Sequence, residues 1–185
     1  MIKKISYCFL CIFFISFSVF AENSHEKKLN NLFTDLKNTS DISKAKKIEL
    51  QIWELWSTHP SEQTLTDLLA KGSMYMSKNQ LTSAHNVFSK AIELDPKWAE
   101  AWNKRATVLY FMGNYQLSQN DIDMVLNLEK RHFGALAGQG LVQSALNNYQ
   151  KAIESYIEIE KIYPSMQTPK LMIPKLKELI KKESI

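Results

Sequence analysis

The feature that most constrains this chain is an internal repeat with a period of 34 residues. Three consecutive blocks align without a gap, at Leu65–Trp98, Ala99–His132 and Phe133–Met166. Two aligned positions hold large residues, Leu68, Trp102 and Leu136 at position 4 and Phe88, Ile122 and Tyr156 at position 24. Two others hold small residues, Gly72, Ala106 and Gly140 at position 8 and Ala84, Ser118 and Ala152 at position 20. Such a period is typical of a solenoid, in which each unit buries its apolar face against the next.

The pattern resembles the tetratricopeptide repeat (TPR), in which small residues at positions 8 and 20 let two antiparallel helices approach closely. The segment Phe88-Ser89-Lys90-Ala91-Ile92-Glu93-Leu94-Asp95-Pro96 is similar to the second helix of that family and its end. The departures are Lys71, where the family favours an apolar residue, Leu109 and Gln143, where it favours tyrosine, and Lys130, where it favours proline. The resemblance implies an all-α fold, a right-handed α-solenoid of antiparallel helix pairs with about three repeats and helical caps.

The resemblance also sets the expected boundaries. Helix pairs are expected at 66–78 and 81–94, at 99–112 and 115–128, and at 133–146 and 149–162, with turns at 79–80, 113–114 and 147–148. Asn and Gly at these turns tolerate left-handed backbone conformations. Residues 167–185 are expected to form an amphipathic capping helix, with Pro174 in its first turn.

Residues 22–64 precede the repeats and read as a further helix pair, at 26–36 and 41–56, with Asp41 as a helix N-cap. We interpret this pair as a degenerate repeat that caps the array. Trp53 and Trp56 are expected to be core residues against the first full repeat, and the alternative is that they form an exposed aromatic binding site.

The first 21 residues have the order of a secretory signal peptide. Lys3 and Lys4 precede an uncharged apolar stretch at 5–20, and Val19 and Ala21 are small residues before a cleavage point. Export to the periplasm with cleavage after Ala21 is therefore expected, which leaves no stable membrane insertion. The alternative is an uncleaved membrane anchor, although the apolar stretch is shorter than the ~20 residues of a typical span. Both cysteines lie inside this segment, so disulfides are not expected in the mature protein.

Composition and motifs argue against several function classes. The formal net charge is only +4, and the densest lysine cluster lies on the last helix, so nucleic-acid binding is not expected. No histidine pair has metal-ligand spacing, and no serine sits in a nucleophile-elbow motif, so no metal site, cofactor or catalytic residue is assigned. Gly134, Gly138 and Gly140 lie within an expected helix, which favours helix packing over a nucleotide-binding loop.

The resemblance also implies a binding surface, because the first helix of each repeat lines a concave groove in that family. Carried onto this chain, the groove residues are Asn103, Thr107, Tyr110 and Leu141, with His132 at the edge beside Arg131. An asparagine amide can both donate and accept hydrogen bonds, and tyrosine combines an apolar face with a polar tip. The basic clamp that some members use to hold a terminal carboxylate is missing, because Leu69 and Ser73 stand at its positions.

These features predict an exported protein-interaction module or scaffold whose partner is a protein or peptide. The alternative is an accessory subunit or small enzyme of cell-envelope metabolism that carries the repeats, and a purely structural envelope subunit is a third possibility. The sequence leaves the oligomeric state open.

Overall fold

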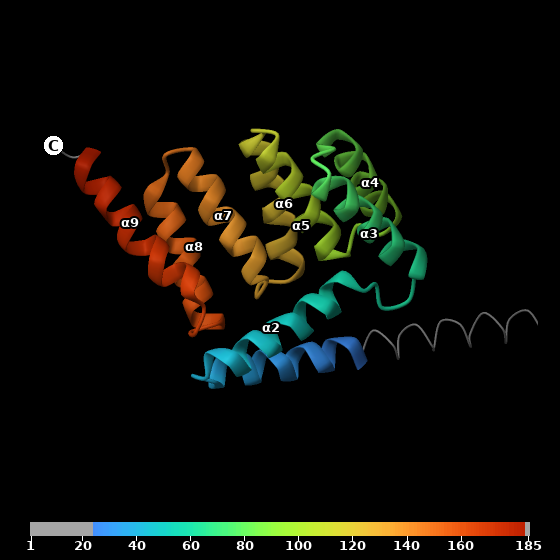
Figure 1. The fold of residues 1–185 in the computed structure, drawn as a ribbon, viewed down its shortest axis with the longest axis horizontal. Coiled ribbons are helices and arrows are strands. Elements are labelled where there is room, and N and C mark those ends of the chain that lie inside the picture. The colour runs from blue at the N-terminus through green and yellow to red at the C-terminus, as the bar shows by residue number, and fades with distance from the viewer. Residues whose placement is uncertain (1–23, 184–185) are drawn as a thin grey trace, which may run out of the picture.

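A computed structural model of the chain describes residues 24–183. The expected signal peptide, including Val19 and Ala21, lies outside the described residues. Residues 24–38 are helical and are followed by α2 (Ile42–Ser57), α3 (Gln63–Ser77), α4 (Leu81–Leu94), α5 (Ala99–Phe111), α6 (Tyr115–Leu128), α7 (Phe133–Ala145), α8 (Tyr149–Ile162) and α9 (Gln167–Glu183) (Figure 1). Every regular element of the described chain is a helix, which confirms the all-α solenoid.

The three repeats are the pairs α3–α4, α5–α6 and α7–α8. Their second helices begin and end at the expected residues. Each pair turns at a residue with positive φ, namely Asn79 (56°), Gly113 (77°) and Asn147 (61°), which are the turn residues that the sequence indicated. These left-handed residues end each first helix tightly, so the second helix packs back against it antiparallel.

Small residues bring the paired helices close together. A Cβ atom placed on Gly72 would lie 2.3 Å from the Phe88 ring, and one on Gly140 would lie 2.5 Å from the Tyr156 ring. Position 8 of the repeat therefore faces position 24, and the glycine provides the space that the large ring fills. In the middle repeat Ala106 replaces the glycine, and the smaller Ile122 stands opposite.

Helix α9 packs against α8 and covers the last repeat with Leu176, which is buried. It begins at Gln167, so the first turn contains Pro169, while Pro174 lies inside the helix. The expected first-turn position of Pro174 is wrong because the helix starts two residues before Pro169. A proline at an interior position lacks the N–H that would bond to the preceding turn.

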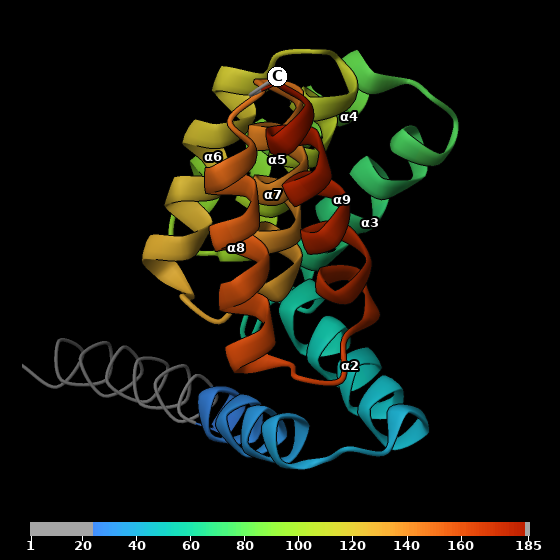
Figure 2. The ribbon, with the colours of Figure 1, turned by 90° about the vertical axis from the view of Figure 1, so that its left-hand side faces the viewer.

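The N-terminal hairpin, residues 24–57, does not stack on the first repeat as a further repeat would. It lies crosswise beneath the array, as two views at right angles show (Figures 1 and 2). Its apolar residues Phe33, Ile52 and Trp56 share one core cluster with Phe133 and Tyr163 of the third repeat and its exit. Asp41 caps α2 as expected, accepting hydrogen bonds from the backbone N–H groups of Ser43 and Lys44.

The expected packing of Trp53 and Trp56 against the first repeat is therefore corrected. Both indoles contact His132 and Phe133 at the start of α7. The hairpin reaches the first repeat at its last residue, Trp98, whose Nε1 donates to the Trp56 carbonyl (3.0 Å) just before α5 begins. The hairpin has a full apolar face, and this face packs into the core cluster that includes Phe133 and Leu136 of α7. Trp56 is buried and Trp53 is half-buried.

Candidate functional site

The first helices of the three repeats form one face of the array. Helix α3 contacts α5 and α5 contacts α7, so these helices line a continuous inner surface, which we call the groove. The N-terminal hairpin covers one end of the groove, where α2 contacts α5 and Trp53 lies against Gly134 of α7. The accessible part of the groove therefore extends from the hairpin toward the C-terminal ends of α5 and α7.

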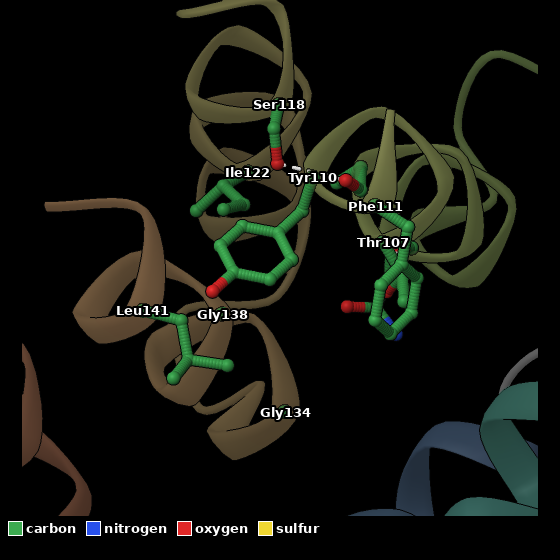
Figure 3. A pocket seen from close by; sticks show the side chains of 10 residues that line it. Thr107, Tyr110, Phe111, Ser118, Ile122, Gly134, Gly138 and Leu141 are labelled. Carbon is green, nitrogen blue, oxygen red and sulfur yellow. Dashed lines mark hydrogen bonds between the residues drawn. The ribbon is translucent and has the colours of Figure 1, made fainter. Parts of the chain in front are cut away.

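A pocket opens there between α5 and α7, with α6 behind it. It has a volume of about 150 Å³, and Figure 3 shows the side chains that line it. Its lining consists of Asn103, Ala106, Thr107, Tyr110, Phe111, Ser118, Ile122, Gly134, Gly138 and Leu141. The Tyr110 ring forms one wall and Leu141 faces it from α7 (Figure 3). We call this space the α5–α7 pocket.

Two glycines of α7 create the space. Gly134 and Gly138 are one turn apart on the face that α7 turns toward α5, so α7 itself places no side chain in the gap at these two positions. A Cβ on Gly138 would make only ordinary contact, 3.6 Å from Ile122 Cδ1, and a larger side chain would extend into the pocket. A Cβ on Gly134 would lie 2.4 Å from the Trp53 ring, so this glycine also gives room to the hairpin.

The polar side chains of the pocket are already hydrogen-bonded to the protein. Asn103 Nδ2 donates to Glu100 Oε2 (2.9 Å), Thr107 Oγ1 donates to the Asn103 carbonyl (2.9 Å), and Ser118 Oγ donates to the Ala106 carbonyl (2.7 Å). The Tyr110 hydroxyl makes no hydrogen bond with any described residue and points toward Gly138 and Leu141 (Figure 3). The pocket therefore presents an apolar surface with one free hydroxyl.

A buried ion pair closes the hairpin end of the groove. Glu100 is 1% exposed and accepts from Nε2 of the fully buried His132 at 3.0 Å, while the Lys104 ammonium lies 3.1 Å from its other oxygen. The Ala135 N–H donates to His132 Nδ1, so the proton that Glu100 accepts is on Nε2. Burial raises the pKa of Glu100, but the His132 hydrogen bond and the Lys104 charge outweigh burial and hold that pKa below its usual value.

The structure brings four of the six expected groove residues together. Asn103, Thr107, Tyr110 and Leu141 all line the α5–α7 pocket. Tyr110 and Leu141 are accessible, with Leu141 43% exposed, whereas Asn103 is only 8% exposed and has a structural bond to Glu100.

The other two residues, Arg131 and His132, hold the hairpin. Arg131 pairs with Glu129 (2.7 Å), donates to Asn30 Oδ1 (2.6 Å) and covers the Phe33 ring at 4.4 Å. His132 is buried beneath Trp56. The expectation that these two side chains face a free groove is therefore corrected, because the hairpin occupies that edge.

Sequence reasoning missed Phe111, Ile122, Gly134 and Gly138 as part of the site. Gly134 and Gly138 carried a usable signal, because the matching positions of the middle repeat hold Glu100 and Lys104, so the third repeat lacks side chains there. Within residues 24–183, no group of three or more His, Cys, Asp or Glu side chains is placed to hold a metal ion. None of the described helices is long and apolar enough to cross a membrane.

Comparison with known proteins places these features in a family. The TPR repeat model matches residues 72–113. A TPR repeat-containing protein of Rhizobium etli is 35% identical over 158 residues, which cover 85% of this chain and 77% of the relative.

Two solved structures share the fold at low identity. The first TPR of Spaghetti (RPAP3), solved with an HSP90 peptide, superimposes with a TM-score of 0.62 at 18% identity, covering 64% of this chain and 94% of that chain. The MamA protein superimposes with a TM-score of 0.54 at 18% identity, covering 89% of this chain and 88% of that chain. Because the identity to the R. etli protein extends over most of both chains, this chain belongs to the tetratricopeptide-repeat family.

Proposed function

We propose that this protein is an interaction module that binds a segment of another protein in the α5–α7 pocket. The observation that carries the proposal is the pocket itself, an apolar space on the inner face of the array with Leu141 and Phe111 exposed at its rim (43% and 62%). Apolar side chains around a concave site are the usual lining of binding pockets. The related first TPR of Spaghetti (RPAP3) was solved with a bound peptide, which supports a peptide or protein as the class of partner.

A matched pair of variants tests this role. Leu141→Asp places a charge at the rim of the pocket, and Leu171→Asp places the same charge on α9, where Leu171 is 71% exposed. Proteins that the wild type captures from periplasmic and membrane fractions should bind the Leu171→Asp variant as tightly as the wild type. They should bind the Leu141→Asp variant weakly. The direct affinity of the purified partner should follow the same order. Equal binding to both variants would show that the partner binds outside this pocket.

We also propose that the protein acts in the periplasm, after export and cleavage behind Ala21. The basic, apolar and small-residue order of residues 1–21 supports this location. N-terminal sequencing of protein recovered from the periplasm should begin at Glu22. Recovery of the intact N-terminus in the membrane pellet would establish an anchored protein instead.

A further inference from the structure

The size of the α5–α7 pocket limits what can fill it. Its volume of about 150 Å³ is too small for a stretch of backbone and suits a single side chain. An engineered apolar cavity of about 150 Å³ in another protein binds benzene. The ring of one phenylalanine therefore matches the space.

The lining also limits the charge of the occupant. None of the ten lining residues is charged, and the side chains of Asn103, Thr107 and Ser118 already donate to acceptors of the protein. A charged group would lose its hydration here without gaining an oppositely charged partner, which is costly in an apolar site. The lining therefore favours an uncharged side chain.

The nearest ionised groups do not change this conclusion, because they compensate one another. Glu100 is paired with Lys104 and hydrogen-bonded to His132, and the Lys104 ammonium lies 5.7 Å from the centre of the Trp53 ring. An acidic peptide end would find no free cation in this part of the groove. The charges around the pocket therefore favour binding of a segment that carries no net charge.

We infer that the partner inserts one phenylalanine-sized apolar side chain, carried on an uncharged segment, between Tyr110 and the bare face of α7. This inference rests on the proposed function and adds the chemistry of the ligand. The exposed Phe111 and Leu141 at the rim contact the residues that flank the inserted ring. The free Tyr110 hydroxyl points toward α7 at the same opening (Figure 3) and can donate to a backbone carbonyl of the segment.

Benzene is a probe for the ring site that needs no identified partner. Titration of the full protein with benzene, followed by methyl NMR, should shift the Ile122 and Leu141 methyl signals in a saturable way. Gly138→Leu should abolish these shifts because its side chain fills the pocket. Ser83→Leu adds the same side chain at an exposed position of α4 and should leave the shifts intact. If Gly138→Leu does not fold, Gly138→Val should weaken benzene binding, because the smaller valine side chain fills part of the pocket.

A second titration tests the charge of the segment. A neutral peptide with one central phenylalanine should compete with benzene, and an acidic peptide of equal length should not. Absence of saturable benzene shifts, or equal competition by the acidic peptide, would overturn the inference. Those results would leave the interaction role intact as long as partner binding still depends on Leu141. Benzene binding combined with partner binding that ignores Leu141→Asp would instead overturn the proposed function.

Discussion

The indole of Trp56 lies flat against the imidazole of His132, with ring centroids 3.8 Å apart and an interplanar angle of 8°. This stack joins α2 to the start of α7, although the two residues lie far apart in the sequence. Trp56 is buried, and its carbonyl also accepts a hydrogen bond from Trp98. One residue of the hairpin therefore contacts the N-cap residues of both α5 and α7.

Trp56→Ala should lower the free energy of unfolding by ~3–5 kcal/mol, because it leaves a cavity above His132 and Phe133. Leu50→Ala provides a control on the same helix, since Leu50 is 59% exposed and should contribute less than ~0.5 kcal/mol. Urea denaturation followed by circular dichroism measures both. Similar losses in the two variants would contradict the docked position of the hairpin.

Acid should weaken the protein through Glu100. Its folded pKa lies below the unfolded value of about 4.3, so the carboxylate contributes its full stability above that pH. As the pH falls further, the unfolded chain binds the proton first and the free energy of unfolding decreases. Urea titrations between pH 7 and pH 3 should show this loss in the wild type.

Glu100→Gln should flatten that acid dependence, at the cost of lower stability at pH 7. Glu93→Gln serves as the control, because Glu93 belongs to an exposed pair with Lys90 and such pairs contribute little. An acid profile that is unchanged in Glu100→Gln would assign the loss to other carboxylates.

Two glycines of α7 should respond in opposite directions to the same substitution. Gly140→Ala drives its Cβ into the buried Tyr156 ring at 2.5 Å and should destabilise the protein by ~1–3 kcal/mol. Gly138→Ala meets only Ile122 at 3.6 Å and should be neutral or stabilising by up to ~1 kcal/mol, because alanine has the better helix propensity. Thermal melts of the two variants check this order, and a reversed order would disprove the assigned packing.

Helix α4 allows a test of the repeat phase. Ala84 is fully buried, so Ala84→Leu should overpack the helix pair and cost ~1–3 kcal/mol. Lys90 is exposed on the same helix, and Lys90→Leu should change the stability by less than ~0.5 kcal/mol. Chemical denaturation that ranks the Lys90 variant as the less stable of the two would mean that the phase is wrong.

Local pattern explains why the repeats could be predicted from the sequence. The pairing of positions 8 and 24, as in Gly72 with Phe88, is made within one 34-residue unit, and the turn at Asn79 depends on one residue that tolerates a left-handed backbone. Both leave a signal that recurs three times along the chain. The second helices of all three repeats were accordingly predicted to the residue.

The docking of the hairpin left no such signal. Its apolar face was visible in the sequence, but such a face does not indicate which surface covers it. Arg131 reaches Asn30 across 101 positions, and each residue alone reads as an ordinary surface polar group. For the same reason His132 was expected at an open groove edge, since its burial depends on Trp56.

The crosswise hairpin also changes how the array should fold. In a simple repeat protein each unit touches only its neighbours, so end units can unfold independently. Here Tyr163 donates to Glu49 across 114 positions, and burial together with the Glu49 carboxylate raises the pKa of Tyr163 to about 12. Contacts between such distant parts of the chain raise the contact order, which slows folding. They also tie the first and last units together, so the array should melt in one cooperative step instead of fraying from its ends.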